Sequence, residues 1–371
     1  MTSSTKMGST EAIFLVLSVM INHIILNLPK DILTSAGSAS LLNLLYISLI
    51  VLGIIYLIGK LLKRFPGVDI LDISEFLGGK KLKYVIGIVF IFYFLSTASI
   101  FLRSFAESLK LMYFQRTPLI FLFLLFIISI VITNKFGTNS LIQSNTLIMP
   151  IVLFSIIFIF FANIDNFTLQ RMFPILGKGL SPTFFSGMSN IFAFGGIAYL
   201  YFIPPGLKNT NDYNKIAFTS MILSIVWLFL SVATLLFMFP SVANTSDILP
   251  LYFASRFIDF GRFLQRLDAI FLLIWIVSII SYLSIVMSFS VNVFKKITEF
   301  KYINIIIYVF ATLLLLLSLI PRNSSQVLFL ESHFYKFNVI AVNFVLALTI
   351  LILANIKHKR KFKRKGDMIS T

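Results

Sequence analysis

Cysteine is absent from this chain of 371 residues, which excludes disulfides and thiolate metal sites. Charge is scarce as well, because Asp, Glu, Lys and Arg together make up only 12% of the residues. Histidine occurs three times, and no two copies are close in sequence. There is no P-loop, no paired buried carboxylates and no zinc-ligand spacing. We therefore predict that the protein is not an enzyme and has no catalytic residues, no metal site and no cofactor.

Hydrophobic residues, by contrast, are unusually abundant. They make up 58% of the chain, and the mean hydropathy is +0.96. Soluble domains contain about half apolar and about a quarter charged residues, so this composition indicates an integral membrane protein. Runs of about 20 apolar residues are helix spans, and no strand alternation is present. We predict an all-α integral membrane protein with about ten transmembrane helices. They lie near residues 12–34, 41–62, 83–113, 118–133, 145–163, 183–206, 214–239, 264–294, 302–320 and 335–356.

Lysine and arginine predict the orientation of these spans. With the N-terminus inside, the cytoplasmic loops and the tail hold 20 of the 31 basic residues. In the loops these are Lys6, Lys60, Lys63, Arg64, Lys80, Lys81, Lys83, Lys135, Lys208, Lys215, Lys295, Lys296 and Lys301. Arg103, Lys110 and Arg116, near the outer end of the third span, oppose this orientation. We expect both termini to be cytoplasmic, with one polytopic domain over residues 1–356 and a basic cytoplasmic tail over 357–371.

The net charge of +17 could indicate a nucleic-acid partner. The positive charge is concentrated in membrane-flanking loops and in the tail, however, so anionic lipid head groups account for it better. We expect membrane lipid as a partner and no nucleic acid.

The sixth span contains the clearest interruption. Residues 186–209 are apolar and long enough to cross a bilayer, yet Gly195 and Gly196 lie at the middle and Pro204-Pro205 near the end. Each glycine in the middle of a helix destabilises the helix by about 1 kcal/mol relative to alanine. Broken helices mark the binding sites of many secondary transporters. The alternative, which the sequence leaves open, is that the glycines let two helices pack closely.

Three other spans carry polar groups at membrane depth. Asn22 and His23 lie at the middle of the first span, where they face either a wet cavity or a hydrogen-bonding neighbour. In the third span, Tyr93 and Thr97 lie further down the helix that carries Arg103. The eighth span adds a polar stripe: Ser278, Ser281, Tyr282 and Ser284. Such a stripe could line a polar pathway through the protein, or its small serine side chains could let neighbouring helices pack closely.

Charged groups near the outer ends of two spans are candidates for gating or assembly. Arg103 and Glu107 are four residues apart, so they share a helix face and can pair. The alternative is that both side chains extend to the membrane interface. Arg266 and Asp268 precede the eighth span and can pair across one helical turn.

Several stretches, taken in order, resemble the B subunits of spore germinant receptors over essentially the whole chain. This is the endospore germination permease family, within the amino acid–polyamine–organocation superfamily. The stretches that carry the resemblance are residues 65–78, 102–107, 116–118, 173–175, 263–268 and the interrupted sixth span. The resemblance implies a LeuT-like fold of two inverted five-helix repeats, with broken helices one and six around a central site.

Three positions depart from the family pattern. Asn22 and Ile24 stand where relatives often have Gly-x-Gly, and Ile197 stands where a Glu often follows the glycine of span six. Gln265 replaces the Glu that is common before the arginine of span eight. The predicted site is therefore less acidic than the family pattern.

The resemblance implies a sensor that binds a small nutrient in the inner membrane of the spore and signals to an A subunit and a C lipoprotein. The alternatives are an amino acid permease carrying out net uptake and a nutrient-gated ion or water conduit. We expect the nutrient to contact Asn22, His23, Tyr93, Thr97, Phe194, Gly195, Gly196, Tyr199 and Tyr282.

None of these nine residues carries a fixed charge if His23 is neutral, so a strongly charged ligand would lack a counter-ion. A zwitterion could place its carboxylate at the N–H groups after Gly196 and its ammonium at Asn22 or at free carbonyls of span one. We therefore expect a neutral amino acid, or an uncharged nutrient such as a sugar or nucleoside.

Overall fold

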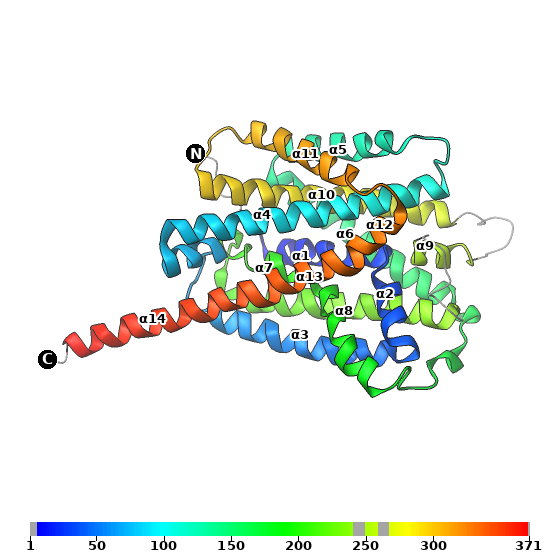
Figure 1. Cartoon of the computed structure of the whole chain (residues 1–371), viewed down its shortest axis with the longest axis horizontal. Coiled ribbons are helices and arrows are strands. Elements are labelled where there is room, and N and C mark those ends of the chain that lie inside the picture. The colour runs from blue at the N-terminus through cyan, green and yellow to red at the C-terminus, as the bar shows by residue number, and fades with distance from the viewer. Residues whose placement is uncertain (1–5, 240–248, 259–266, 370–371) are drawn as a thin grey trace.

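The computed structural model describes residues 6–239, 249–258 and 267–369, with side chains as far as residue 360. Figure 1 shows a bundle of helices that run mostly along its long axis, with both chain ends at the same, left-hand end. Among the described residues, strand-like pairing is limited to an isolated parallel bridge between Met7 and Leu207. The predicted all-α architecture is confirmed.

The first half of the chain forms five spans. Span one is divided into α1 (Ser9–Ile25) and α2 (Leu28–Ala36), and a short 3-10 turn (Gly37–Ala39) leads to span two. Spans two to five are α3 (Ser40–Leu62), α4 (Ile70–Met112), α5 (Leu119–Lys135) and α6 (Thr138–Ala162).

The second half repeats this pattern. Span six is discontinuous, with η4 (Ser181–Phe185), η5 (Ser186–Phe194) and α7 (Ile197–Leu200). Spans seven to nine are α8 (Tyr213–Met238), α10 (Leu267–Thr298) and α11 (Ile303–Leu319), with the short α9 (Pro250–Ser255) before α10. Span ten comprises α12 (Ser324–Phe329), η10 (Leu330–Tyr335), α13 (Lys336–Val339), η11 (Ile340–Leu346) and α14 (Ala347–Ile369).

Length and composition identify the membrane-crossing segments. Within the described residues, 6 helical stretches are long and apolar enough to span a membrane. Three apolar helices of 17 residues, α1, α5 and α11, add to them. With the discontinuous sixth segment, these stretches account for every predicted span, and the chain is an integral membrane protein.

Two spans begin earlier than their hydropathy predicts. Helix α4 begins at Ile70, where the Asp69 carboxylate caps it by accepting from the N–H groups of Leu71 and Asp72. A kink at Gly78 and Gly79 then separates this amphipathic start from the span itself. Helix α12 begins at Ser324, where the Asn323 side chain accepts from the Gln326 N–H at 2.9 Å. The earlier start of span ten brings residues 324–334 into the helical bundle.

Helix α1 lies at the centre of the bundle (Figure 1) and packs against α6, α8 and α10. Most of its residues are buried, including the polar Ser18 and Asn22. By contrast, α5, α6 and α11 each leave large apolar side chains exposed, such as Ile128, Phe154 and Leu316. The outer helices therefore face lipid, and the broken span one is enclosed by protein.

At the end of the bundle that holds both termini, hydrogen bonds and ion pairs join several spans. The Met7 N–H donates to the Gly206 carbonyl at 2.6 Å, and the Ile70 N–H donates to the Tyr201 carbonyl at 3.1 Å. Lys296, at the end of α10, pairs with Asp69 at 2.7 Å and with Asp72 at 2.6 Å. Burial raises the pKa of the Asp69 carboxyl, and the Lys296 ammonium opposes that rise. Spans one, three, six and eight are thus joined on this side.

Candidate functional site

Span one breaks at Leu26 and Asn27, one helical turn beyond the polar pair that the sequence singled out. Neither residue is glycine or proline. Asn27 precedes α2, and Pro29 lies in its first turn, where the missing N–H of proline costs no hydrogen bond. The Asn27 side-chain amide donates to Glu331 Oε2 at 2.8 Å, which links the break in span one to span ten.

Span six breaks at Gly195 and Gly196, as predicted. The Gly195 carbonyl accepts from the Ala198 N–H at 3.2 Å, and it also accepts from two side chains, the Tyr93 hydroxyl at 3.1 Å and Asn343 Nδ2 at 2.9 Å. Asn343 Nδ2 also donates to the Tyr93 hydroxyl at 3.0 Å. Spans three and ten therefore contribute side-chain donors to a backbone carbonyl at the break.

The two glycines have different surroundings. A Cβ on Gly196 would lie 2.5 Å from Met20 Cγ, so Gly196 allows close packing of span six against α1. A Cβ on Gly195 would lie 3.1 Å from the Tyr335 hydroxyl, 3.2 Å from Val339 Cγ2 and 3.4 Å from the Tyr93 hydroxyl. The structure thus supports both interpretations of the pair: one glycine serves helix packing, and the other faces polar groups at the break.

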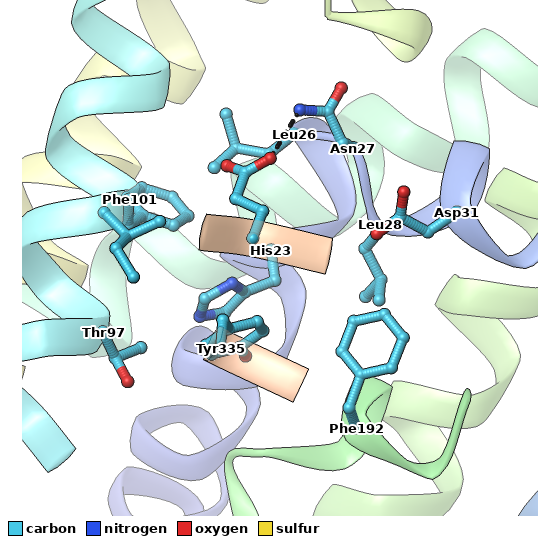
Figure 2. Close-up of a pocket in the computed structure, with 11 residues that line it drawn as sticks. His23, Leu26, Asn27, Leu28, Asp31, Thr97, Phe101, Phe192 and Tyr335 are labelled. Carbon is cyan, nitrogen blue, oxygen red and sulfur yellow. Dashed lines mark hydrogen bonds between the residues drawn. The ribbon is translucent and has the colours of Figure 1, made fainter. Parts of the chain in front are cut away.

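An aromatic cluster fills the space between the two breaks. The His23 ring stacks on Tyr335, with 5.3 Å between centroids and 11° between planes, and His23 Nε2 lies 2.9 Å from the Tyr282 hydroxyl. The edge of Phe101 packs on His23 at 5.0 Å. Figure 2 shows His23 and Tyr335 side by side, with Phe101 and Thr97 on one flank and Phe192 on another. Tyr335 thus separates the His23 side of the site from Gly195.

A small cavity of about 30 Å³ lies beside this cluster, on the side of the span-one break. A water molecule needs about 10–15 Å³ on this scale, so the cavity holds a group of that size and not a whole nutrient. Its lining combines aromatic, apolar and acidic side chains: His23, Leu26, Asn27, Leu28, Asp31, Thr97, Ile100, Phe101, Phe192, Glu331 and Tyr335. A larger ligand requires Tyr335 or Phe192 to move.

The structure brings together part of the predicted site. His23 and Thr97 line the cavity, Tyr282 contacts His23, and Tyr93 contacts Gly195. Phe194 is buried next to the break, and Gly196 packs on α1. The Tyr199 ring packs instead with Phe94 and Phe289, at 5.1 Å and 4.8 Å between centroids.

Asn22 lies on a different face of α1 from His23, because successive residues of a helix point about 100° apart. Its Oδ1 accepts from Ser278 Oγ at 2.9 Å, and its Nδ2 donates to the Ser18 carbonyl at 2.8 Å. Asn22 therefore joins α1 to α10 and does not line the cavity.

Of the predicted gating residues, Arg103 and Glu107 lie near the C-terminal end of α4, and Asp268 lies in the first turn of α10. Arg103 and Glu107 pair at 2.6 Å, and both side chains are largely buried, so they do not extend to the interface. Asp268 Oδ2 accepts from the hydroxyls of Tyr113 at 3.1 Å and Tyr252 at 3.0 Å. Arg266 lies outside the described residues.

Two carboxylates of the site were missed by the sequence reasoning. Glu331 falls outside a tenth span that starts at residue 335, and Asp31 was counted only as part of span one. The pattern Asn323–Gln326 at the start of α12 is a helix-capping pattern that would have placed Glu331 inside a helix. Glu331 and Asp31 line the cavity, so the site contains two carboxyl groups besides the nine predicted residues.

Comparison with known proteins agrees with the resemblance found in the sequence. A family described as "Spore germination protein" matches residues 6–327. Spore germination protein A2 of Bacillus subtilis (strain 168) is 22% identical over 295 residues, which cover 78% of this chain and 80% of that protein. Spore germination protein KB of the same organism is 25% identical over 237 residues, covering 60% and 61% of the two chains.

Solved structures identify the fold. A Na⁺-coupled sialic acid symporter in a substrate-bound outward-open state has a TM-score of 0.65 at 12% identity, covering 92% of this chain and 80% of that chain. Mhp1, a nucleobase-cation-symport-1 family transporter in a closed conformation, has a TM-score of 0.67 at 13% identity, covering 94% and 78%. The predicted LeuT-like fold, with broken helices one and six, is confirmed.

Proposed function

This chain belongs to the spore germination protein family, and on that premise we propose that it is the nutrient-binding subunit of a spore germinant receptor. Its transporter-like fold would bind a small nutrient between spans one and six and pass a conformational change to partner subunits. One observation carries the proposal: the two helix breaks face each other across His23 and Tyr335, beside a small cavity. Broken helices facing each other in a transporter-like fold are a typical substrate site.

The site can change shape when it is occupied. Span ten supplies both Tyr335, which fills the space between the breaks, and Asn343, which holds the Gly195 carbonyl. Its backbone departs from regular α-helix at Leu330–Tyr335 and again at Ile340–Leu346, where it forms π-helical turns. Such turns occur frequently at functional sites. A nutrient that displaces Tyr335 would therefore move span ten, which continues into α14 and the basic tail.

The proposal includes a location and partners. We place the chain in the inner membrane of the spore because of its family. We place both termini in the cytoplasm because the loops on their side and the tail hold 20 of the 31 basic residues. The partners would be a receptor A subunit and a C lipoprotein. Net amino acid uptake and nutrient-gated conduction are the competing functions of the same fold.

The test uses spores whose only germinant receptor contains this chain, exposed to single nutrients. We expect germination with a small set of neutral amino acids, and none in matched spores that lack this subunit. A response confined to strongly acidic or strongly basic compounds would contradict the proposal. Uptake of the same labelled nutrient against a gradient, in vesicles that contain only this chain, would favour the permease instead.

A further inference from the structure

Glu331 is a partly buried carboxyl group that forms no ion pair within the described residues. Its Oε2 accepts from Asn27 Nδ2 at 2.8 Å, and the Ser104 hydroxyl is a second hydrogen-bond partner. No Lys, Arg or His within the described residues pairs with it, and the charges that face it, Asp31 and Glu107, are also negative. A carboxyl group enclosed without a counter-cation is costly to ionise and tends to keep its proton. A positive group brought by a ligand would supply the missing partner and favour the ionised carboxylate.

Thr97 supplies a second, independent observation. Its side chain lines the same cavity and is only 7% exposed. Its hydroxyl has no hydrogen-bond partner among the described residues. Buried hydroxyl groups are normally hydrogen-bonded, so this oxygen is available to accept from a donor placed in the cavity.

The aromatic residues that line the rest of the cavity also favour binding of a cation. Aromatic faces attract ammonium groups, and the cavity is lined by His23, Phe101, Phe192 and Tyr335. One such contact already exists in the structure, where Lys336 Nζ lies 4.6 Å from the centre of the Phe192 ring. Lys336 also lies 3.9 Å from Asp31, so Asp31 has a cation of its own and Glu331 does not.

We propose that Glu331, Thr97 and the surrounding aromatic rings form a subsite for the ammonium group of the nutrient. The cavity volume of about 30 Å³ fits a group of that size. The nutrient is then an amino acid or another compound with a protonated primary amine, and not a sugar or nucleoside. This assignment rests on the proposed function, since it presumes that the nutrient binds between the two breaks.

The experiment compares compounds that differ at the ammonium group. Spores whose only receptor contains this chain are exposed to the common L-amino acids, to the matched 2-hydroxy acids such as L-lactate, and to D-glucose and inosine. Only ammonium-bearing compounds elicit germination. A 2-hydroxy acid, D-glucose or inosine that acts at a similar concentration overturns the subsite while leaving the proposed function in place. No response to any compound, with normal protein level, overturns both.

One variant and a matched control test whether Glu331 binds the ammonium group. Glu331→Gln keeps the shape and the acceptor for Asn27, and it raises the half-maximal nutrient concentration by about 30-fold or more, as expected for loss of one partner of a buried charge pair. Asp165→Asn, which removes an exposed carboxylate, is the control and leaves that concentration within about 2-fold. An unchanged response in Glu331→Gln overturns the subsite.

Thr97→Val keeps the proposal testable if Glu331→Gln does not fold. Removing an unpaired buried hydroxyl leaves the thermal midpoint of the purified chain unchanged or higher, because no internal hydrogen bond is lost. The half-maximal nutrient concentration nevertheless rises by about 10-fold or more, the effect of losing one hydrogen bond to a charged group. A normal nutrient response in this variant contradicts the role assigned to Thr97.

Discussion

Replacing Gly196 with alanine destabilises the whole protein, by about 1–3 kcal/mol, the usual cost of overpacking a filled interior. The added Cβ would lie 2.5 Å from Met20 Cγ and 3.5 Å from the Met20 backbone nitrogen. Met20 is 3% exposed and belongs to the central helix α1, so it has little room to move. Thermal unfolding of the purified chain in detergent measures the loss, and immunoblotting of spore membranes shows the lower protein level.

Gly195→Ala is the matched control. Its Cβ would approach the hydroxyls of Tyr335 and Tyr93 at 3.1 Å and 3.4 Å, contacts that small side-chain shifts can relieve. We expect a near-normal protein level. We also expect the half-maximal nutrient concentration to shift by at least about 10-fold, because a change of about 1.4 kcal/mol in binding free energy changes affinity by that factor. Equal loss of protein in both variants would mean that both glycines serve packing alone.

Removing Arg103 produces the second large effect. Arg103 and Glu107 pair at 2.6 Å with side-chain exposures of 8% and 13%, and Arg103 also donates to the Ser318 carbonyl at 3.4 Å. Arg103→Met leaves the Glu107 carboxylate buried and unpaired, which lowers the free energy of unfolding by about 3–5 kcal/mol. Chemical or thermal unfolding of the purified chain measures this change.

The double variant Arg103→Met with Glu107→Met separates pairing from packing. Because replacing both partners of a buried ion pair with apolar residues is often close to neutral, the double variant recovers most of the lost stability. Lys83→Met serves as the control, since Lys83 and Glu75 form a more exposed pair worth at most about 1 kcal/mol. A double variant as unstable as the single one would contradict a role in charge pairing.

The fold could be predicted from hydropathy because a membrane span requires a long apolar run, whatever its neighbours are. The break in span six was visible in the sequence because Gly195 and Gly196 are costly in a helix. The break in span one was not located there, since Leu26 and Asn27 are ordinary helix residues. Asn27 followed by Pro29 is a helix-start pattern, and it would have indicated that a new helix begins inside the span.

The chemistry of the site was less predictable, because it depends on contacts between distant segments. Asn22 and His23 are neighbours in sequence, yet one bonds to Ser278 and the other stacks on Tyr335. Glu331 lies just before the apolar run of span ten, so hydropathy alone assigns it to a loop. Only the packing of α12 and η10 against α4 brings its carboxylate to the cavity.

The central claim is that the nutrient binds between the two breaks, and the absence of cysteine from the chain allows a direct measurement. In Thr97→Cys and Phe192→Cys the introduced thiol is the only one in the protein. Both positions line the cavity, whereas Phe185, which is 80% exposed, supplies the control variant Phe185→Cys. The rate at which a water-soluble thiol reagent modifies each variant is measured with and without a nutrient that elicits germination. We predict that the nutrient changes the rate several-fold at positions 97 and 192 and leaves it unchanged at 185. Unchanged rates at both cavity positions, in receptors that still respond to the nutrient, would contradict binding at this site.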